Sequence, residues 1–413
     1  MEQEIIPGSN LDQKTLDEQK AREFFIETLP GEQLIEIPQN PNCEVAVVVP
    51  VYTETSERIL AQILSLTKQR EIGKENFEAL YVINNGEDNG SEEFQSVRRL
   101  NQQILNLPIW KNREADYTGC TPEQQTLFEE LRENFNLFAI DKSSPDNAIA
   151  SCTVGKARGR GVAEASRRFF DNQKNGVLVQ TDADARFEDQ DYLKKAINAF
   201  QEDPSIIGIA GDILYEFSPD EETELTSEQV REKWIELVLL KTAKRLSQFT
   251  DKLDNEIQTG GDSHDDIAFS GANMITKSYE TAVAGGISDQ ESGEDTEFSQ
   301  RLNQFAQERG KRVTTMPDSL KVVTALRESG RTPVRLKTFY GITLSGDPLV
   351  EDPDVRQRTF VPLRELYTRL VAKARTTDKG RRYLEYLYQR APLQFRDPTG
   401  ANDFSFLQII EAA

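Results

Sequence analysis

The sequence predicts an α/β fold with a mostly parallel sheet flanked by helices. Short β-branched runs at residues 44–50 and 79–83 enclose a stretch of helical period at residues 55–68. Strand, helix and strand in this order form a βαβ unit, and such a unit implies parallel strands. Continuous apolar runs are typical of strands buried on both faces. We therefore expect one α/β domain over about residues 43–325.

The remaining elements are expected in a regular alternation along the chain. A helix at about residues 12–28 lies in an N-terminal arm, residues 1–42. The segment Thr226–Gln229 has the form of a capping box and predicts a helix behind it. The other predicted elements are strands near 137–140, 177–181, 206–211 and 267–270, and helices near 94–105, 122–134, 155–172, 226–253 and 360–390.

The composition excludes several classes of protein. The 413 residues are 37% hydrophobic and 29% charged, which is typical of a globular chain with a sizeable core. The net charge of −21 argues against a general nucleic-acid binder, which needs a basic surface. No apolar run approaches the roughly 20 residues that span a bilayer, and no signal peptide is evident. With three scattered cysteines and no CxxC pair, we expect a cytoplasmic protein with reduced thiols.

The charges are unevenly distributed along the chain. Residues 1–42 contain nine acidic and three basic residues, whereas residues 327–396 contain fifteen basic and eight acidic ones. The basic segment falls in a predicted, mainly helical C-terminal extension over residues 326–413. It could make a peripheral contact with phosphates, an anionic membrane surface or an acidic partner. It could equally be a solvated helical face that packs on the acidic remainder.

Two aspartates follow the predicted strand at 177–181. Asp182 and Asp184 are two positions apart, so in extended chain their side chains point to the same side. Open α/β sheets bind ligands at this end of their strands, and Mg²⁺ or Mn²⁺ often joins carboxylates to a diphosphate. An EF-hand loop does not fit, because Phe187 replaces the turn glycine and Leu193 the closing glutamate. The pattern suggests a metal–diphosphate enzyme, although Asp-x-Asp also occurs by chance among 70 acidic residues.

Polar residues also follow the first two predicted strands. Pro50, Tyr52 and Glu54 come at the end of the first strand and offer backbone groups, a ring and a carboxylate to a base or ribose. Asn84 and Asn85 end the second strand, and their amides could read a base edge. Both segments could also be plain loops.

A glycine-rich segment carries three cations before a predicted helix. Lys156, Arg158 and Arg160 alternate with small residues there, and a helix N-terminus with cations is a diphosphate site. The glycine spacing fits neither a P-loop nor a dinucleotide fingerprint.

Two acids open a later helix. Glu294 and Asp295 precede the apolar Phe298 and Leu302, and a carboxylate there could activate an acceptor hydroxyl as general base. They could also be ordinary acids at a helix start, where the macrodipole favours them.

In their order, these segments resemble family 2 glycosyltransferases of the GT-A fold. The resemblance covers about residues 44–325 and rests on segments 47–54, 82–86, 155–158, 182–184, 269–274, 285–287 and 294–298. It implies a hexosyltransferase-class enzyme with a nucleotide-sugar donor, such as a UDP- or GDP-sugar, and a hydroxyl-bearing acceptor. It also implies Mn²⁺ or Mg²⁺ bound through the Asp-x-Asp motif.

The resemblance further implies roles for individual residues. Asp295, with Glu294 as the alternative, would be the catalytic base of an inverting transfer. Asp184 and Asp182 would hold the metal, and His264, the only histidine, is a further candidate ligand or an ordinary loop residue. The donor would contact Pro50, Tyr52, Glu54, Asn85, Lys156, Arg158, Asp182, Gly271 and Asn273.

The sequence also departs from the family pattern. Many relatives carry Asp-Asp-Gly-Ser where residues 84–87 read Asn-Asn-Gly-Glu, and the Gln-x-x-Arg-Trp motif of processive synthases is absent. A retaining glycosyltransferase of the same fold stays an alternative. So does a sugar-phosphate nucleotidyltransferase, although it would need a glycine-rich basic signature where residues 50–54 stand. A third alternative is an inactive binding domain that uses the basic extension as its contact surface.

Overall fold

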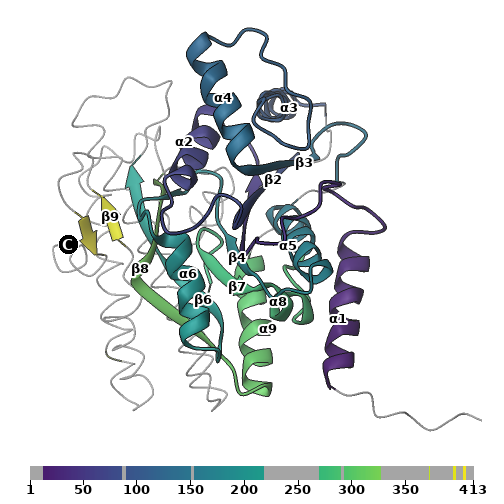
Figure 1. The fold of residues 1–413 in the computed structure, drawn as a ribbon, viewed down its shortest axis with the longest axis vertical. Coiled ribbons are helices and arrows are strands. Elements are labelled where there is room, and N and C mark those ends of the chain that lie inside the picture. The colour runs from purple at the N-terminus through teal and green to yellow at the C-terminus, as the bar shows by residue number, and fades with distance from the viewer. Residues whose placement is uncertain are drawn as a thin grey trace, which may run out of the picture. The chain divides into compact units, whose positions relative to one another are not determined.

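Contacts divide the chain into two compact units. Unit 1 comprises Met1–Ala183, Leu193–Ala210 and Ile267–Thr314, and unit 2 comprises Asp184–Tyr192, Gly211–Asp266 and Thr315–Ala413. The predicted division at residues 42 and 325 follows composition and stays a prediction. The computed structural model (Figure 1) describes residues 13–85, 90–149, 153–217, 269–289, 293–326, 372, 394–396 and 403–405.

A sheet with a parallel centre forms the core of unit 1. The strands β1 (Val45–Val51), β2 (Phe77–Asn84), β3 (Asn136–Lys142) and β4 (Val177–Gln180) pair in parallel in the order β3-β2-β1-β4. Next to β4, the strand β7 (Met274–Lys277) runs antiparallel, and it pairs on its other side with Gly208–Ala210 of β6 (Ile206–Phe217). The predicted α/β fold with a largely parallel sheet is confirmed.

Helices cover both faces of this sheet. The neighbouring residues Tyr81 and Val82 of β2 point to opposite faces. Val82 faces α5 (Val154–Asp171), and the Tyr81 ring packs against Trp110, with ring centroids 5.2 Å apart. Trp110 in turn donates through Nε1 to the carbonyl of Ile104 in α3 (Glu92–Leu105). The surrounding helices are α2 (Ser56–Thr67), α4 (Pro122–Asn134), α6 (Tyr192–Glu202), α8 (Ser278–Val283) and α9 (Glu294–Glu308).

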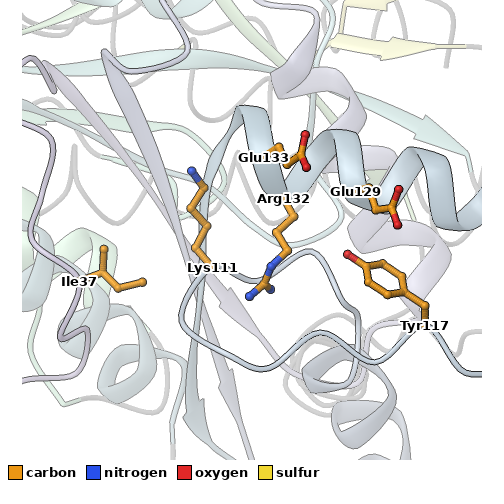
Figure 2. Close-up of a pocket in the computed structure, with 6 residues that line it drawn as sticks. All are labelled: Ile37, Lys111, Tyr117, Glu129, Arg132 and Glu133. Atoms are coloured by element: carbon orange, nitrogen blue, oxygen red, sulfur yellow. The ribbon is translucent and has the colours of Figure 1, made fainter.

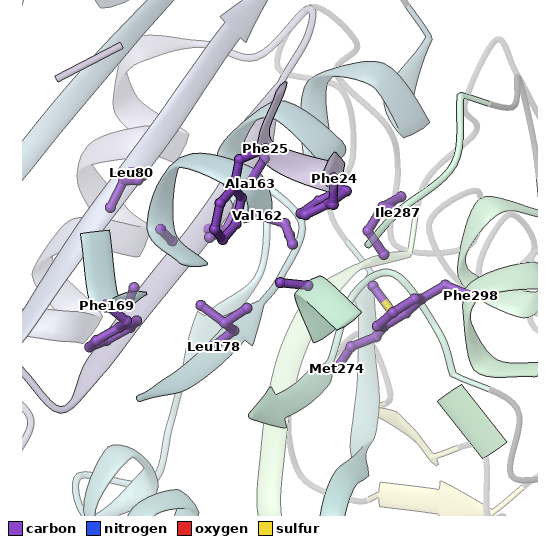
Figure 3. Packing of buried hydrophobic residues seen from close by; sticks show 14 of the residues in the cluster. Phe24, Phe25, Leu80, Val162, Ala163, Phe169, Leu178, Met274, Ile287 and Phe298 are labelled. Atoms are coloured by element: carbon purple, nitrogen blue, oxygen red, sulfur yellow. The ribbon is translucent and has the colours of Figure 1, made fainter. Parts of the chain in front are cut away.

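The described part of the N-terminal arm, residues 13–42, packs on the core of unit 1. The helix α1 (Gln13–Thr28) contacts α5 and α8 and buries Phe24 and Phe25 in a cluster with Val162 and Ile287 (Figure 3). Gly286 has a φ of 56°, and a Cβ there would collide with the Phe24 ring. The arm therefore docks through apolar packing although its charge is strongly acidic.

Most predicted elements match those of the structure, and one strand is placed differently. A strand was expected at 267–270, but Phe269 and Ser270 lie in a loop and the strand β7 begins at Met274. The N–H of Asn273 donates to the carbonyl of Ser270, so residues 270–273 form a turn. The strand begins after this turn, at Met274, where it pairs with both β4 and β6. The predicted helices at 226–253 and 360–390 lie outside the described residues, apart from residue 372.

The described part of unit 2 consists of short strand pairs. The strand β5 (Arg186–Phe187) runs antiparallel to β8 (Arg312–Leu326), with Arg186 opposite Val323. The end of β6 pairs in parallel with β9 (Gln394–Arg396), which runs antiparallel to β10 (Asp403–Ser405). In the described part of the chain, no helix is long and apolar enough to cross a membrane.

Candidate functional site

A buried guanidinium joins three separate segments of unit 1. Arg158 lies in the second turn of α5, and its side chain is only 1% exposed. Its Nη1 donates to the carbonyl of Gly271 at 2.6 Å, and its Nη2 donates to Asp182 Oδ1 at 2.7 Å. The Nε lies 3.9 Å from Glu294 Oε1. Residues predicted for the site from distant parts of the sequence therefore meet at this side chain.

Gly271 connects this guanidinium to Asp295. Its N–H donates to Asp295 Oδ2 at 2.9 Å, while its carbonyl accepts from Arg158. A Cβ at position 271 would lie 2.7 Å from Arg158 Nη2, so a larger residue would push the guanidinium away. Glycine is required here by close approach.

The two acids at the start of α9 differ in their surroundings. Glu294 is 7% exposed, and burial raises the pKa of its carboxyl although Arg158 opposes this shift. Asp295 is half-buried, and its Oδ1 accepts from the N–H of Thr296 at 2.8 Å. The pair thus offers one interior carboxyl beside Arg158 and one oriented carboxylate that is more accessible.

Apolar packing fixes the direction of α9. The Phe298 ring stacks on Phe269 with centroids 5.9 Å apart, and a Cβ at Gly208 would lie 2.9 Å from the Leu302 side chain. The predicted apolar stripe of this helix therefore faces the core, and its N-terminus is held beside Gly271.

The Asp-x-Asp motif lies in a turn after β4. The strand ends at Gln180, and Ala183 and Asp184 form a turn, so the expected extended conformation is wrong. The cause is a contact from α2, because Gln62 Nε2 donates to the carbonyl of Asp182 at 2.7 Å and Ala183 is buried. The Asp182 side chain is 43% exposed.

Asp184 is assigned to unit 2 and has a hydroxyl partner there. It is half-buried, and its Oδ1 accepts from Thr324 Oγ1 at 3.0 Å. Thr324 lies in β8 and is 6% exposed. A buried hydroxyl thus orients one of the two carboxylates of the motif.

The cationic glycine segment lies within α5, in agreement with the predicted helix at 155–172, and does not form a separate loop before that helix. Thr153 is the N-cap of α5, so Lys156 and Arg160 both lie within the helix. A Cβ at Gly161 would lie 2.6 Å from Val48 and 2.9 Å from Val82, so glycine lets the helix approach β1 and β2.

The two more exposed cations of this segment have partners. Lys156 Nζ lies 3.0 Å from Asp289, and Arg160 Nη1 lies 3.5 Å from Glu32. The Lys156 side chain is 26% exposed, so it remains the more accessible of the two predicted donor-binding cations.

The segment after β1 is strained. Pro50 lies in β1 opposite Val82 of β2. It comes after the last residue of β1 that pairs with β4, so its missing N–H removes no hydrogen bond between those two strands. Thr53 has a φ of 59°, which is costly for a β-branched residue. Tyr52 is half-buried, and the buried Glu54 lies 3.6 Å from Arg58 Nη1.

Asn84, Asn85 and Asn273, which were predicted to contact the donor, are all buried. Asn85 Nδ2 donates to the carbonyl of Ser143 at 2.7 Å, and its Oδ1 accepts from Asn101. Its amide therefore joins the end of β2 to the residue after β3 and to α3, and the side chain contacts protein where a base edge was expected. Asn273 is 1% exposed and lies in the turn before β7. His264 lies outside the described residues.

Some relevant residues were missed by sequence reasoning. Gln62, which holds the Asp182 carbonyl, is fully buried between Ile59 and Ile63 of α2. A polar residue on an otherwise apolar helix face was a usable signal. Thr324, the partner of Asp184, left no such signal, because their contact joins residues 140 positions apart.

Unit 1 also has a surface pocket of different composition (Figure 2). Arg132 donates there to the carbonyl of Arg113 at 2.7 Å, and burial lowers the pKa of Lys111, helped by the charge of Arg132. None of the predicted site residues lines this pocket, which is formed by Ile37, Lys111, Tyr117, Glu129, Arg132 and Glu133. Within the described residues, no three Asp, Glu, His or Cys side chains cluster as metal ligands.

No protein-family model and no curated protein matches the sequence. Among solved structures, a mannosyltransferase of Pyrobaculum calidifontis in complex with GDP-Man and Mn²⁺ matches at 15% identity and a TM-score of 0.36, covering 92% of this chain and 86% of that one. Residues 1–349 of S. aureus TarS match at 16% identity and a TM-score of 0.36, with coverages of 68% and 60%. GalNAc-T7 with UDP, GalNAc and Mn²⁺ matches at 12% identity and a TM-score of 0.36, with coverages of 72% and 48%. These likenesses are distant, and the function proposed below rests on the geometry of the described residues.

Proposed function

We propose that the protein is a metal-dependent glycosyltransferase that moves a sugar from a nucleoside diphosphate to an acceptor hydroxyl with inversion. The observation that carries this proposal is the convergence of Asp182, Glu294 and Asp295 on Arg158 and Gly271. Asp182 follows a parallel strand at its carboxyl end, which is where open α/β sheets bind ligands. Two carboxylates beside one buried cation, with a third linked through Gly271, are an arrangement that favours chemistry over stability.

The divalent metal would be held by Asp182 and Asp184. Both are half-buried carboxylates, and oxygen ligands of this kind suit Mn²⁺ or Mg²⁺, which complete their shells with water and phosphate. The Asp182 carboxylate keeps 43% exposure while it accepts from Arg158, so it can also reach a ligand. The metal would neutralise charge on the leaving diphosphate.

Asp295 is the proposed general base. As the acceptor oxygen forms its bond to the anomeric carbon, the bond from that carbon to the diphosphate breaks and takes its electron pair with it. The acceptor proton passes to the Asp295 carboxylate. The N–H groups of Gly271 and Thr296 orient this carboxylate, and it is more accessible than Glu294. A positioned base contributes about 10²–10⁴ in rate.

The nucleoside would lie over the segment after β1. Tyr52 offers a ring and Glu54 a carboxylate, and Thr53 between them has a costly positive φ, a feature that is often found at ligand sites. Lys156 is the proposed contact for the donor phosphates, since it is the accessible cation at the start of α5. Asn85 is left out of this site, because its amide is used within the protein.

The proposal is tested by donor screening. UDP-sugars and GDP-sugars are incubated with Mn²⁺ or Mg²⁺, and release of the nucleoside diphosphate is measured together with the anomeric form of the product. Metal-dependent release with inversion is expected. Asp184→Asn should abolish it, whereas Asp171→Asn, which removes the same charge from a 58% exposed carboxylate of α5, should not. Full activity in Asp184→Asn would refute the metal assignment, and retention would refute the inverting mechanism.

A further inference from the structure

We propose that Arg158 is a positioning residue that holds Asp182 and Asp295 in place from inside the protein and does not bind the donor phosphates. This inference rests on the proposed function. It also departs from the role that the sequence resemblance implies for this arginine, because the structure turns the guanidinium inward.

The donors of Arg158 are directed at the protein. Nη1 donates to the Gly271 carbonyl and Nη2 to Asp182, and the side chain is 1% exposed. Its Nε has no hydrogen-bond acceptor among the described residues and faces the Glu294 carboxyl at 3.9 Å. An arginine that binds phosphate presents an accessible fork of N–H groups to the ligand. In Arg158, both terminal nitrogens of the guanidinium already donate to groups of the protein, the Gly271 carbonyl and the Asp182 carboxylate.

The planar guanidinium sets the relative position of two carboxylates. Nη2 contacts Asp182 directly, and Nη1 reaches Asp295 through the backbone of Gly271, whose carbonyl accepts from Arg158 and whose N–H donates to Asp295 Oδ2 at 2.9 Å. Asp182 lies on the donor side of the proposed reaction and Asp295 on the acceptor side. A lysine would keep the positive charge but could not hold two fixed directions at once.

The charge of Arg158 also offsets repulsion among the acids. Asp182, Glu294 and Asp295 come from two segments, and each of the first two contacts the guanidinium or faces it within 3.9 Å. Without the cation, like charges in a poorly solvated site would push these segments apart. Positioning and charge balance therefore depend on the same side chain.

Two variants disturb this arrangement in different ways. Arg158→Lys keeps the charge and loses the fork, whereas Gly271→Ala keeps every polar group and places a methyl group 2.7 Å from Nη2. Since a misplacement of about 1 Å can cost roughly 10²-fold, we expect kcat to fall about 10–100-fold in both. Arg158→Lys should also raise the donor KM through the displaced Asp182, but in an Asp182→Asn background it should change the donor KM less than about threefold. A tenfold rise in donor KM in that background would show that Arg158 binds the donor itself and would overturn the inference.

A double-variant cycle tests the link to the base. In an Asp295→Asn background, Arg158→Lys should lower kcat by a smaller factor than in the wild type, because the base that it positions is already lost and only its effect on Asp182 remains. If the two losses multiply, Arg158 acts independently of Asp295 and the inference fails.

Arg168→Lys is the matched control. Arg168 lies on the same helix, is 3% exposed and pairs with the carboxylate of Glu78 at 2.8 Å. It should lower the melting temperature and leave the kcat of the folded enzyme unchanged. An equal loss of kcat in Arg168→Lys would mean that both variants only loosen α5, and would overturn the inference.

A stability cycle separates failure of this inference from failure of the proposed function. Wild-type protein that turns over no nucleotide sugar would refute the function. The melting temperatures of Arg158→Gln, Asp182→Asn and the double variant, measured without substrate, still test the contact. Their losses should fall short of additivity by about 2 °C or more. Additive losses would mean that Arg158 does not hold Asp182.

Discussion

Two buried arginines of α5 lie in opposite electrostatic surroundings. Arg168 donates through Nε and Nη2 to the Glu78 carboxylate at 3.1 and 2.8 Å, and through Nη1 to the carbonyl of Ile37 at 2.7 Å. One cation therefore meets one carboxylate. Arg158, ten positions earlier, meets Asp182 and faces Glu294, and its buried Nε has no hydrogen-bond acceptor in the described part of the chain.

The difference separates a structural end of the helix from a functional one. A matched and fully bonded pair fixes one geometry, and it ties β2 and the N-terminal arm to α5. An excess of carboxylates around one cation costs stability, and such sites persist where chemistry needs them. The predictions below test this contrast at each end of the helix and between its ends.

The largest effect is expected at the functional end. Asp295→Asn should lower turnover by about 10²–10⁴-fold, because the acceptor hydroxyl loses its base. Donor affinity and melting temperature should stay close to those of the wild type. Steady-state kinetics at saturating donor and a thermal melt measure both. If donor affinity falls and turnover at saturation survives, Asp295 is a binding residue.

The structural end should respond in stability. Glu78→Gln leaves the Arg168 guanidinium buried without a charged partner, which costs about 3–5 kcal/mol. Urea unfolding measures the loss, and the folded variant should keep its kcat. A loss below about 1 kcal/mol would mean that water or another group replaces the carboxylate, and that the contrast between the two arginines is smaller than their contacts indicate.

A substitution in the middle of α5 should lower the stability of the protein, because the helix packs closely on the sheet there. Gly161→Ala places a methyl group 2.6 Å from Val48 and 2.9 Å from Val82, and overpacking of this kind costs about 1–3 kcal/mol. Gly159→Ala is the milder control, since its methyl group meets only the Ile287 residue, with the carbonyl oxygen 3.0 Å away. Both variants gain similar helix propensity. Equal stability of the two variants would contradict close packing of α5 on the sheet.

The smallest effect concerns the arm and depends on pH. Glu32 accepts from Lys142 at 2.7 Å, and this hydrogen bond holds the pKa of its carboxyl below the usual 4.5. A lowered pKa in the folded state gives stability above the unfolded value, and that stability is lost as pH falls through the folded value. The side chain is 44% exposed, so screening limits the contribution to about 0.2–1 kcal/mol.

Glu32→Gln should therefore melt below the wild type at pH 7. The gap should close as the pH falls below 4.5 and the wild-type carboxyl also becomes protonated. Melting curves across this range measure it. A gap that persists unchanged in acid would mean that the contact with Lys142 is not electrostatic.

Local patterns were sufficient to predict the parallel centre of the sheet, but not the start of β7 or the strand β8. The runs that form β1 and β2 are continuous and apolar, and the stripe of α2 has helical period, so neighbouring residues alone determine these elements. The order of the motifs also indicated which distant segments would meet, and Asp182, Gly271 and Asp295 do lie around one side chain. Their roles in catalysis stay predictions.

Features that depend on contacts between distant segments could not be predicted from the sequence. The glycines near Arg158 alternate with cations, which suggested a diphosphate site, and only the contacts of Val48 and Val82 in the sheet show that Gly161 serves packing. The turn at Asp184 likewise depends on Gln62, whose bond to the Asp182 carbonyl spans 120 positions. Asn85 follows a strand as a ligand-binding residue would, but its partner Ser143 lies 58 positions away.

The docking of α1 bears on how the protein is made. Asp17 accepts from Arg309, which lies 292 residues further along the chain, and the partners of Phe24 include Ile287. Phe25 can pack on Phe170 of α5, with ring centroids 5.7 Å apart, but docking of α1 is complete only after the last helix of the unit has been made. At about 5–20 residues per second, this delay lasts roughly 15–60 s on the ribosome. Such high contact order slows folding, and during translation the two phenylalanines are a natural target for a chaperone.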